Sequence, residues 1–349
     1  MRLIAGAPAK LRVALIAATL LIAACQSPGV TPPPAPASGA TGGSLTIYSG
    51  RTEALVGPLL DRYARQTGID FRTRYGDSAQ LAAALLEEGT NSPADVFFAQ
   101  DAGALGAVAS RNLLIPLPDA TLNKVGPAFR SQNKNWVGVS GRARVVAYNP
   151  ARLQEQQLPD SVLGLTDPVW QGRIGWAPTN ASFQAFVTAL RQMEGEDGAR
   201  RWLEGIRANQ VKAFANNTSI VQAVASGEID IGLVNHYYLF AIQKDQGPIS
   251  VRNYHPRDGR AGAMINVAGA AVLASSKNQD AANRFVDFLL SEEAQRYFTT
   301  ETFEYPLLAG IPGPQGAVPI AQIKVPSIDL GSLADLDATL RLLRDVGAL

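Results

Sequence analysis

Two adjacent tyrosines, Tyr237 and Tyr238, are the residues of this sequence with the most specific chemistry, and Asn235 and His236 precede them. The apolar run at 229–234 just before them predicts a buried strand. Ligands of open α/β sheets gather outside the carboxyl ends of strands, so two phenols and an amide at this point suggest a binding site. Two aromatic residues that open a helix are the alternative, and spacing alone does not separate the two interpretations.

Phenol oxygens narrow the choice of ligand. Tyrosine titrates near pH ~10, so ionising one phenol at neutral pH costs roughly 4 kcal/mol. Only a hard, strongly Lewis-acidic cation offsets that cost twice. Magnesium and calcium prefer carboxylates and carbonyls, whereas zinc prefers imidazole and thiolate. The tyrosine pair therefore predicts a site for ferric iron.

The elements that must position this pair follow from the pattern of apolar residues. Residues 44–145 alternate short strands with amphipathic helices, which predicts a βαβαβ unit and a parallel sheet. The same alternation returns around the tyrosines. The apolar runs at 136–140, 144–150 and 265–273 are interpreted as crossings between two lobes, and two crossings imply a hinge. Strands are expected at 45–48, 71–75, 95–98, 173–176 and 211–214, and helices at 78–86, 102–111, 183–193, 199–206 and 220–225.

The first 43 residues predict export and a membrane anchor. Residues 1–24 carry early cations followed by an apolar run too short for a spanning helix, which is typical of a signal peptide. Cys25 ends a segment that resembles the lipobox of bacterial lipoproteins and is the only cysteine, so we expect it to be lipidated rather than catalytic. A plain secretory signal is the alternative. Residues 25–43, rich in Pro, Gly and Ser, then form a tether.

Composition and missing motifs narrow the function. Thirty-one Lys and Arg against 30 Asp and Glu give a net charge of +1, and no basic tract occurs, so we expect no nucleic-acid partner. The sequence has no phosphate loop, no GxSxG elbow, no HExxH and only two histidines, which speaks against an enzyme. An extracytoplasmic hydrolase built on carboxylates remains a remote alternative.

Six short segments occur in a fixed order along the chain. They are Tyr-Ser-Gly-Arg at 48–51, Ala-Asp-Val-Phe-Phe at 94–98, Gly-Val-Ser-Gly-Arg at 138–142, Asn-Asn at 216–217, Asn-His-Tyr-Tyr at 235–238 and Ser-Ser-Lys-Asn at 275–278. Together these segments resemble the ferric-ion-binding proteins, the substrate-binding components of bacterial iron(III) ABC transporters, and the resemblance runs from residue 45 to 349. It implies an α/β, two-lobed type II periplasmic-binding fold, each lobe a mostly parallel sheet flanked by helices.

The family also implies a division of the chain and its partners. Lobe 1 would comprise residues 44–145, lobe 2 residues 146–266, and residues 267–349 would return to lobe 1 with C-terminal helices across the lobes. Such a protein is expected to be a monomer in the cell envelope, outside the cytoplasm. It would close on Fe³⁺ and pass it to an ABC permease with its ATPase subunits.

Carried over by position, Tyr237 and Tyr238 match the family's adjacent tyrosine ligands. Asn217 and Asn235 match asparagines that in some members hold a synergistic anion, phosphate or carbonate. Asn180 and Ser182 lie where the same members bind that anion at the start of a helix. Two phenolates leave Fe³⁺ with one positive charge and with unfilled coordination positions. An anion would balance the charge and occupy some of those positions.

Departures from the family leave lobe 1 without an obvious strong ligand. Thr52 and Gln100 stand where some members have a histidine and a glutamate, and Asn180 and Phe183 stand where others have a tyrosine. Anion and water would then fill the remaining positions, with Arg51 or Arg142 balancing the anion.

Some of these residues have an ordinary structural interpretation. Arg51 could instead belong to an ion pair, and Asn217 could cap its helix. Arg142 and Arg144, which alternate on a predicted strand, could be structural or functional. A binding protein for an iron chelate or a small oxyanion, held by Asn180, Asn217, Asn235 and Arg51, is the main alternative function.

Overall fold

The computed structural model of this chain describes residues 43–349. The predicted signal peptide, Cys25 and nearly all of the predicted tether lie outside this range. Within it, no helix is long and apolar enough to cross a membrane.

The first strands form the parallel unit predicted from the sequence. β1 (Ser44–Ser49) pairs in parallel with β2 (Asp70–Tyr75) on one side and with β3 (Val96–Ala99) on the other. Helix α1 (Glu53–Thr67) connects β1 to β2, α2 (Ser78–Glu88) connects β2 to β3, and α3 (Ala102–Ala109) follows β3. Asp77 and Asp101, which directly precede α2 and α3, cap them by accepting backbone N–H hydrogen bonds.

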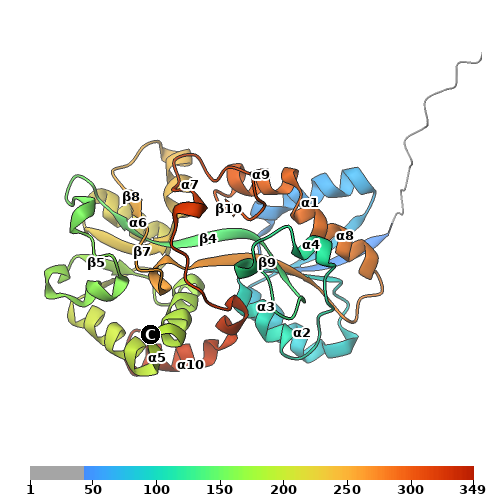
Figure 1. Cartoon of the computed structure of the whole chain (residues 1–349), viewed down its shortest axis with the longest axis horizontal. Helices are drawn as coiled ribbons and strands as arrows, with labels where there is room; N and C mark the ends of the chain where they lie inside the picture. The colour runs from blue at the N-terminus through green and yellow to red at the C-terminus, as the bar shows by residue number, and fades with distance from the viewer. Residues whose placement is uncertain (1–42) are drawn as a thin grey trace, which may run out of the picture. The chain divides into compact units, whose positions relative to one another are not determined.

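One long strand, β4 (Val137–Tyr148), connects the two lobes, although the sequence predicted two separate runs there. Its residues 137–143 pair antiparallel with β9 (Ile265–Val272), and its residues 144–148 pair with β7 (Ile231–Asn235). β4 therefore changes partners within a single strand, at a point where every residue is buried. In Figure 1, β4 and β9 run side by side between the two groups of elements.

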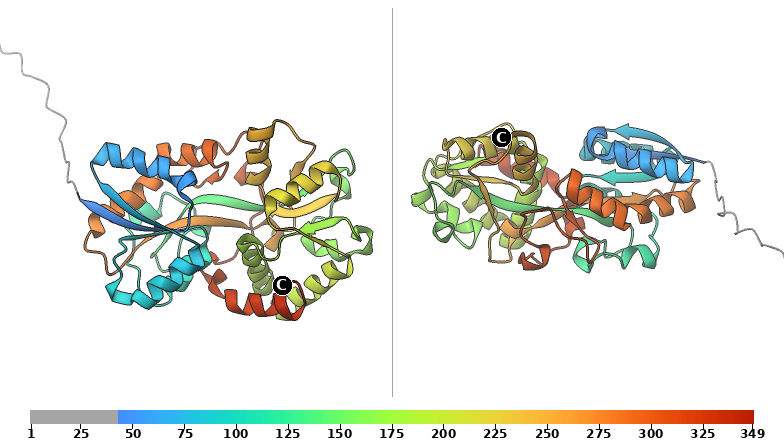
Figure 2. Two further views of the ribbon diagram at one scale, coloured as in Figure 1. Left: turned by 180° about the vertical axis from the view of Figure 1, so that it is seen from behind. Right: turned by 90° about the horizontal axis from the view of Figure 1, so that it is seen from above.

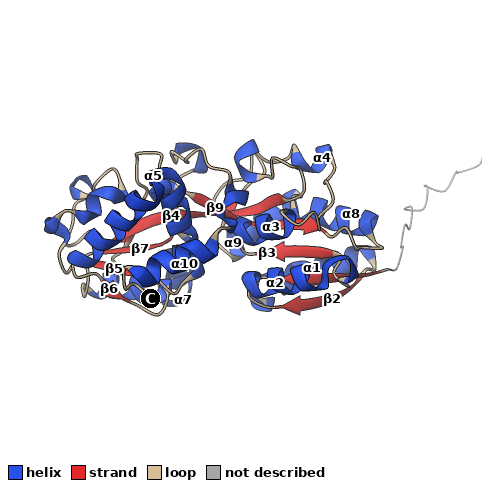
Figure 3. Ribbon diagram, turned by 90° about the horizontal axis from the view of Figure 1, so that it is seen from below, coloured by secondary structure: helices blue, strands red, loops and turns tan. Residues whose placement is uncertain are grey.

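The second group of strands surrounds β7. β4 lies antiparallel on one side of β7 and β5 (Ile174–Trp176) parallel on the other, with β6 (Lys212–Ala213) beyond β5 and β8 (Arg252–Tyr254) on β4. The fold is thus α/β with parallel outer pairs, and the crossing strands run antiparallel because the chain enters lobe 2 on β4 and leaves it on β9. Helices flank the strands in both groups (Figure 3).

The helices of lobe 2 differ in detail from the prediction. α5 (Ala181–Ala208) covers both helices expected at 183–193 and 199–206, because only Gly195, at φ 76°, interrupts it. α6 (Asn217–Ser226) begins three residues earlier than predicted, and Asn216 rather than Asn217 caps it by accepting from the Ser219 N–H. α7 (Tyr237–Gln246) begins at the tyrosine pair.

The chain then returns to the first lobe. α8 (Gln279–Leu289) packs on β9, α9 (Glu292–Glu301) packs near α1, and β10 (Tyr305–Pro306) pairs with β4 at Gly141 and Ser140. The short α4 (Asp119–Leu122) precedes β4. Figure 2 shows the C-terminal α10 (Leu336–Asp345) close to α5 in the other lobe.

The segment before α10 contacts lobe 1 through two glycines of α3. A Cβ on Gly106 would lie 2.1 Å from the carbonyl oxygen of Gly331, and one on Gly103 would lie 2.7 Å from that of Leu333. Only glycine allows this close backbone approach. The turn at Leu330–Ala334 therefore packs tightly on α3, while α10 packs on α5.

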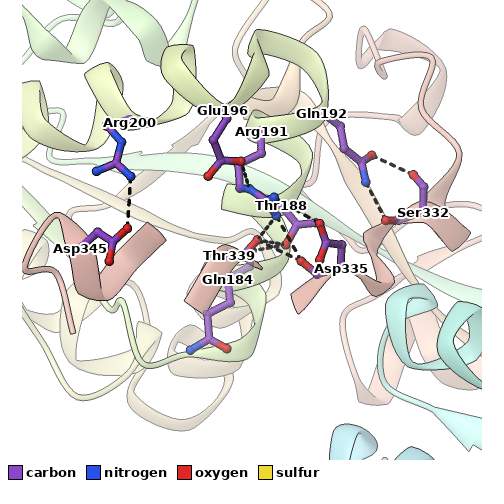
Figure 4. A network of polar contacts seen from close by, with 10 residues as sticks. All are labelled: Gln184, Thr188, Arg191, Gln192, Glu196, Arg200, Ser332, Asp335, Thr339 and Asp345. Atoms are coloured by element: carbon purple, nitrogen blue, oxygen red, sulfur yellow. Dashed lines mark hydrogen bonds and ion pairs between the residues drawn. The ribbon is translucent and has the colours of Figure 1, made fainter. Parts of the chain in front are cut away.

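Arg191 of α5 is the centre of the polar contacts between α5 and the C-terminal segment (Figure 4). Its guanidinium donates to Glu196, to the carbonyl and carboxylate of Asp335, and to the Thr339 hydroxyl. Thr339 also lies 2.7 Å from the buried Thr188 hydroxyl. The C-terminal segment is thereby fixed to lobe 2 at one end and to α3 of lobe 1 at the other.

Candidate functional site

Tyr237 and Tyr238 lie in the first turn of α7, and only His236 separates them from Asn235, the last residue of β7. Their rings stack with centroids 4.3 Å apart and planes 27° from parallel. Burial, with a smaller contribution from Tyr238, raises the pKa of Tyr237 far above its ordinary value. The Tyr237 phenol is therefore protonated at neutral pH unless a cation replaces its proton.

A cavity of about 470 Å³ opens beside the pair and is lined from both lobes. Lobe 2 contributes Tyr237, Tyr238 and other residues near the start and middle of α7. Lobe 1 contributes residues from the end of α9 and from the segment after β1. The lining comprises Arg51, Leu55, Gln100, Thr218, Tyr237, Tyr238, Ala241, Lys244, Asp245, Glu301, Thr302, Phe303 and Glu304.

Arg51 is buried in this cavity wall rather than exposed, and it is already neutralised. Its Nη2 donates to Glu304 Oε1 at 2.8 Å, and both side chains are at most 3% exposed. The Ser140 hydroxyl donates to the other carboxylate oxygen of Glu304 at 2.6 Å. The ion-pair interpretation of Arg51 therefore holds in this structure, and its guanidinium is a weaker candidate for an anion.

A second, smaller cavity of about 40 Å³ lies between the N-terminal ends of α2 and α5 and shares Gln100 with the larger one. Arg142 and Arg144, alternate residues of β4, both line it. Neither forms an ion pair with a carboxylate in the described part of the chain, although both are at most 3% exposed. The lining comprises Asp77, Ser78, Gln100, Asp101, Arg142, Arg144, Ala181, Ser182, Asn235, Met264 and Asn266.

Arg144 carries a charge that the surrounding residues only partly satisfy. Its Nη2 donates to the Leu233 carbonyl at 2.8 Å, but Nε and Nη1 have no hydrogen-bond partner among residues 43–349. The guanidinium lies over the rings of Phe183 and Phe186, 5.5 and 5.2 Å from their centroids. Burial lowers the pKa of Arg144 to about 9. A buried cation without a counter-ion is costly, which is the condition expected of a site that receives an anion.

Three of the residues predicted to bind an anion gather near Arg144. Ser182 and Asn235 both line the small cavity, and the Asn217 amide donates to the Ser182 hydroxyl at 3.5 Å. Asn180 caps α5, because its side-chain oxygen accepts from the Ser182 N–H at 3.0 Å. Arg51 is the exception, since it lines the larger cavity with the tyrosines.

His236, between Asn235 and the tyrosines, is buried and has a structural role. Its Nδ1 accepts from the Ala143 N–H at 3.1 Å, and its ring stacks on Tyr305 with centroids 4.4 Å apart. These contacts hold the start of α7 against the point where β4 changes partners. Burial lowers the pKa of His236 to about 3, so the ring is neutral.

Sequence reasoning missed Glu304, and it left Arg144 undecided between a structural and a functional role. Glu304 lies 253 positions from Arg51, so their pairing left no signal in residue spacing. The only available sign was an acidic residue directly before the buried Tyr305 and Pro306. For Arg144, alternation with Arg142 on a strand indicated a shared face and did not show that the face was buried.

Comparison with known proteins identifies the family of this chain. Residues 91–324 match the family model of bacterial extracellular solute-binding proteins. The major ferric iron-binding protein of Neisseria meningitidis serogroup A is 38% identical over 310 residues, covering 87% of this chain and 92% of the relative. The Fe(3+)-binding periplasmic protein of Serratia marcescens is 35% identical over 292 residues, covering 83% of this chain and 86% of the relative.

Solved structures give the same result. Iron-bound HitA from Pseudomonas aeruginosa superimposes with a TM-score of 0.80 at 36% identity, over 87% of this chain and 99% of that one. The Trichodesmium protein IdiA (FutA), solved with iron and citrate ligands, gives a TM-score of 0.78 at 31% identity with the same coverage. The type II periplasmic-binding fold predicted from the sequence is confirmed. The chain therefore belongs to the ferric-ion-binding proteins, within the family of bacterial extracellular solute-binding proteins.

Proposed function

We propose that this protein captures ferric iron between its two lobes outside the cytoplasm and delivers it to an ABC permease with its ATPase subunits. The observation that carries the proposal is the stacked Tyr237–Tyr238 pair, which faces a cavity lined from both lobes. Binding of ferric iron offsets the free-energy cost of ionising two phenols, whereas binding of softer or less Lewis-acidic cations does not. The similarity to ferric iron-binding relatives supports the same cargo.

A synergistic anion, phosphate or carbonate, would complete the coordination of the ion. Ser182, Asn217 and Asn235 would hold it at the start of α5, with Asn180 fixing the helix end, because backbone N–H groups there favour negative charge. The buried charges of Arg142 and Arg144 support this placement. Arg51 remains a candidate at the edge of the site, although Glu304 already balances its charge.

We infer that residues 1–24 are a signal peptide, that Cys25 becomes lipidated and that residues 25–43 tether a monomeric body to a membrane. Lobe 1 would comprise residues 44–145, and lobe 2 residues 146–266. Residues 267–349 would return to lobe 1, with the C-terminal helices lying across the lobes, as the packing of α10 on α5 supports. The partner change of β4 near Ala143 and Arg144 supports a hinge close to the first boundary.

The two unpaired arginines also favour a second candidate function, the binding of a small oxyanion or an iron chelate. In that case the tyrosines would only stack or donate hydrogen bonds. The two candidates differ in what they need: an oxyanion protein binds phosphate without iron, whereas an iron-binding protein binds phosphate or carbonate tightly only together with the metal.

Equilibrium binding measurements distinguish the iron-binding function from the oxyanion-binding function. Full-length protein is dialysed against Fe³⁺ held soluble by a weak competing chelator, with and without phosphate or carbonate. We expect one ferric ion per chain, bound more tightly when the anion is present. Tight phosphate binding that is indifferent to iron would instead support the oxyanion function, and no iron uptake in any buffer would refute the proposal.

A further inference from the structure

Glu304 is the buried carboxylate of the cavity that contains the tyrosine pair. It lies between α9 and β10, in the segment that returns to lobe 1, and its side chain is 2% exposed. The other two carboxylates of the lining, Asp245 and Glu301, are exposed, and Glu301 pairs with Lys244. Lobe 1 thus provides one fixed, desolvated carboxylate beside the two phenols of lobe 2.

Two hydrogen bonds fix the orientation of this carboxylate without using all of its capacity. Arg51 donates to Oε1 at 2.8 Å and Ser140 donates to Oε2 at 2.6 Å. A carboxylate offers about four lone-pair sites, so each oxygen keeps one for a further partner. Carboxylates that ligate metals are typically held in this way by outer hydrogen bonds, which set their direction and raise the affinity for the metal.

Charge balance favours a carboxylate at this position. Two phenolates reduce the charge of Fe³⁺ to one, and a third anionic oxygen from the protein reduces it to zero. A low-dielectric cavity penalises any net charge that remains.

From these observations we propose that Glu304 is a third protein ligand of the ferric ion, supplied by lobe 1. The inference rests on the proposed function, since it concerns the same cargo. The ion then connects α7 of lobe 2 to the segment after α9 of lobe 1, so that metal binding itself joins the lobes. Carboxylate oxygen is a hard donor that suits a hard cation.

The test compares Glu304→Gln with a matched control, Glu293→Gln, in the full-length protein. Glu293 lies on α9 outside the cavity and forms an exposed pair with Arg62. Affinity for Fe³⁺ is measured by competition with citrate, and the phenolate-to-iron absorption band is recorded in the same samples. We expect Glu304→Gln to lose at least about 100-fold in affinity while keeping a shifted band, and the control to stay within about twofold of wild type.

A double variant separates ligation from a merely structural role, because Glu304→Gln alone leaves Arg51 buried without its anion. Arg51→Gln combined with Glu304→Gln removes both charges. If Glu304 is a ligand, the double variant keeps the loss. Affinity restored to the wild-type level in the double variant, or an unchanged affinity and band in Glu304→Gln, would overturn the inference. Absence of the band in the wild type would instead refute the proposed function.

Discussion

The rings of Tyr237 and Tyr238 stack on each other, 4.3 Å between centroids, although consecutive residues of a helix normally point about 100° apart. The stack occurs in the first turn of α7, where free N–H groups and the helix dipole favour negative charge. His236 holds this turn against β4, because its Nδ1 accepts from the Ala143 N–H, and Asn253 of β8 donates to the His236 carbonyl. Two phenols are thus presented together at a helix N-terminus, where a bound cation must offset the cost that burial adds to the ionisation of Tyr237.

Acidification should release the cargo. Each phenolate must give up its metal bond to take a proton, so two protons compete with one ferric ion. We expect the apparent affinity to fall by about two orders of magnitude for each pH unit below neutrality, as measured by chelator competition from pH 7 to 5. An affinity that stays flat over this range would exclude phenolate ligation.

Arg144→Met should separate anion binding from stability. The substitution removes a buried charge that has two unpartnered nitrogens, but it also removes contacts to Phe183 and Phe186. These effects oppose each other, so the free energy of unfolding without ligand should change by no more than about 1 kcal/mol. The stimulation of iron binding by phosphate or carbonate should fall at least about tenfold. Arg257→Met, which removes an exposed pair with Glu155, is the control. Full stimulation in Arg144→Met would place the anion elsewhere.

Stability should depend on pH through His255. Burial lowers the pKa of His255 from 6.5 to about 4. Between these values the unfolded chain takes up a proton that the folded chain does not, so the free energy of unfolding falls as pH falls, by up to about 3 kcal/mol. Urea denaturation of the iron-free protein at pH 7, 6 and 5 measures this slope. His255→Gln should roughly halve this slope, because His236, whose pKa burial lowers to about 3, contributes in the same direction. An unchanged slope would show that His255 does not contribute.

Arg191→Met should loosen the C-terminal segment. Its guanidinium is 12% exposed and makes contacts to Glu196, Asp335 and Thr339 at once, which an isolated surface pair does not. We expect the free energy of unfolding to fall by about 1–2 kcal/mol and the amide hydrogens of α10 to exchange faster. Arg200→Met removes only an exposed pair with Asp345 and should be nearly neutral. Equal effects of both substitutions would contradict the central role of Arg191.

The sequence was informative where function depends on neighbours along the chain. The apolar run before Asn235 placed the tyrosine pair at the end of a strand, and the structure has β7 end at Asn235. The alternation of strands and helices predicted the parallel unit of lobe 1. Local capping was predicted to within one residue, since the cap of α6 is Asn216 and not Asn217.

Contacts between segments that are distant in the sequence could not be predicted. The Arg51–Glu304 pair joins residues from opposite ends of the described chain, and burial of Arg144 depends on aromatic side chains of α5. A charged residue is usually exposed, so nothing in the composition indicated that either arginine is buried. The partner change within β4 was hidden for a similar reason, because one continuous strand and two adjoining strands share the same apolar pattern.

The measurement that tests the central claim most directly is a visible absorption titration of the full-length protein with ferric citrate, in phosphate or carbonate buffer. It should be run beside the double variant Tyr237→Phe with Tyr238→Phe, and beside Tyr254→Phe as a tyrosine control on β8. We predict a broad phenolate-to-iron charge-transfer band that saturates at one ion per chain, persists in the control and vanishes in the double variant. No band in the wild type, or the same band in the double variant, would contradict the assignment of these tyrosines as iron ligands.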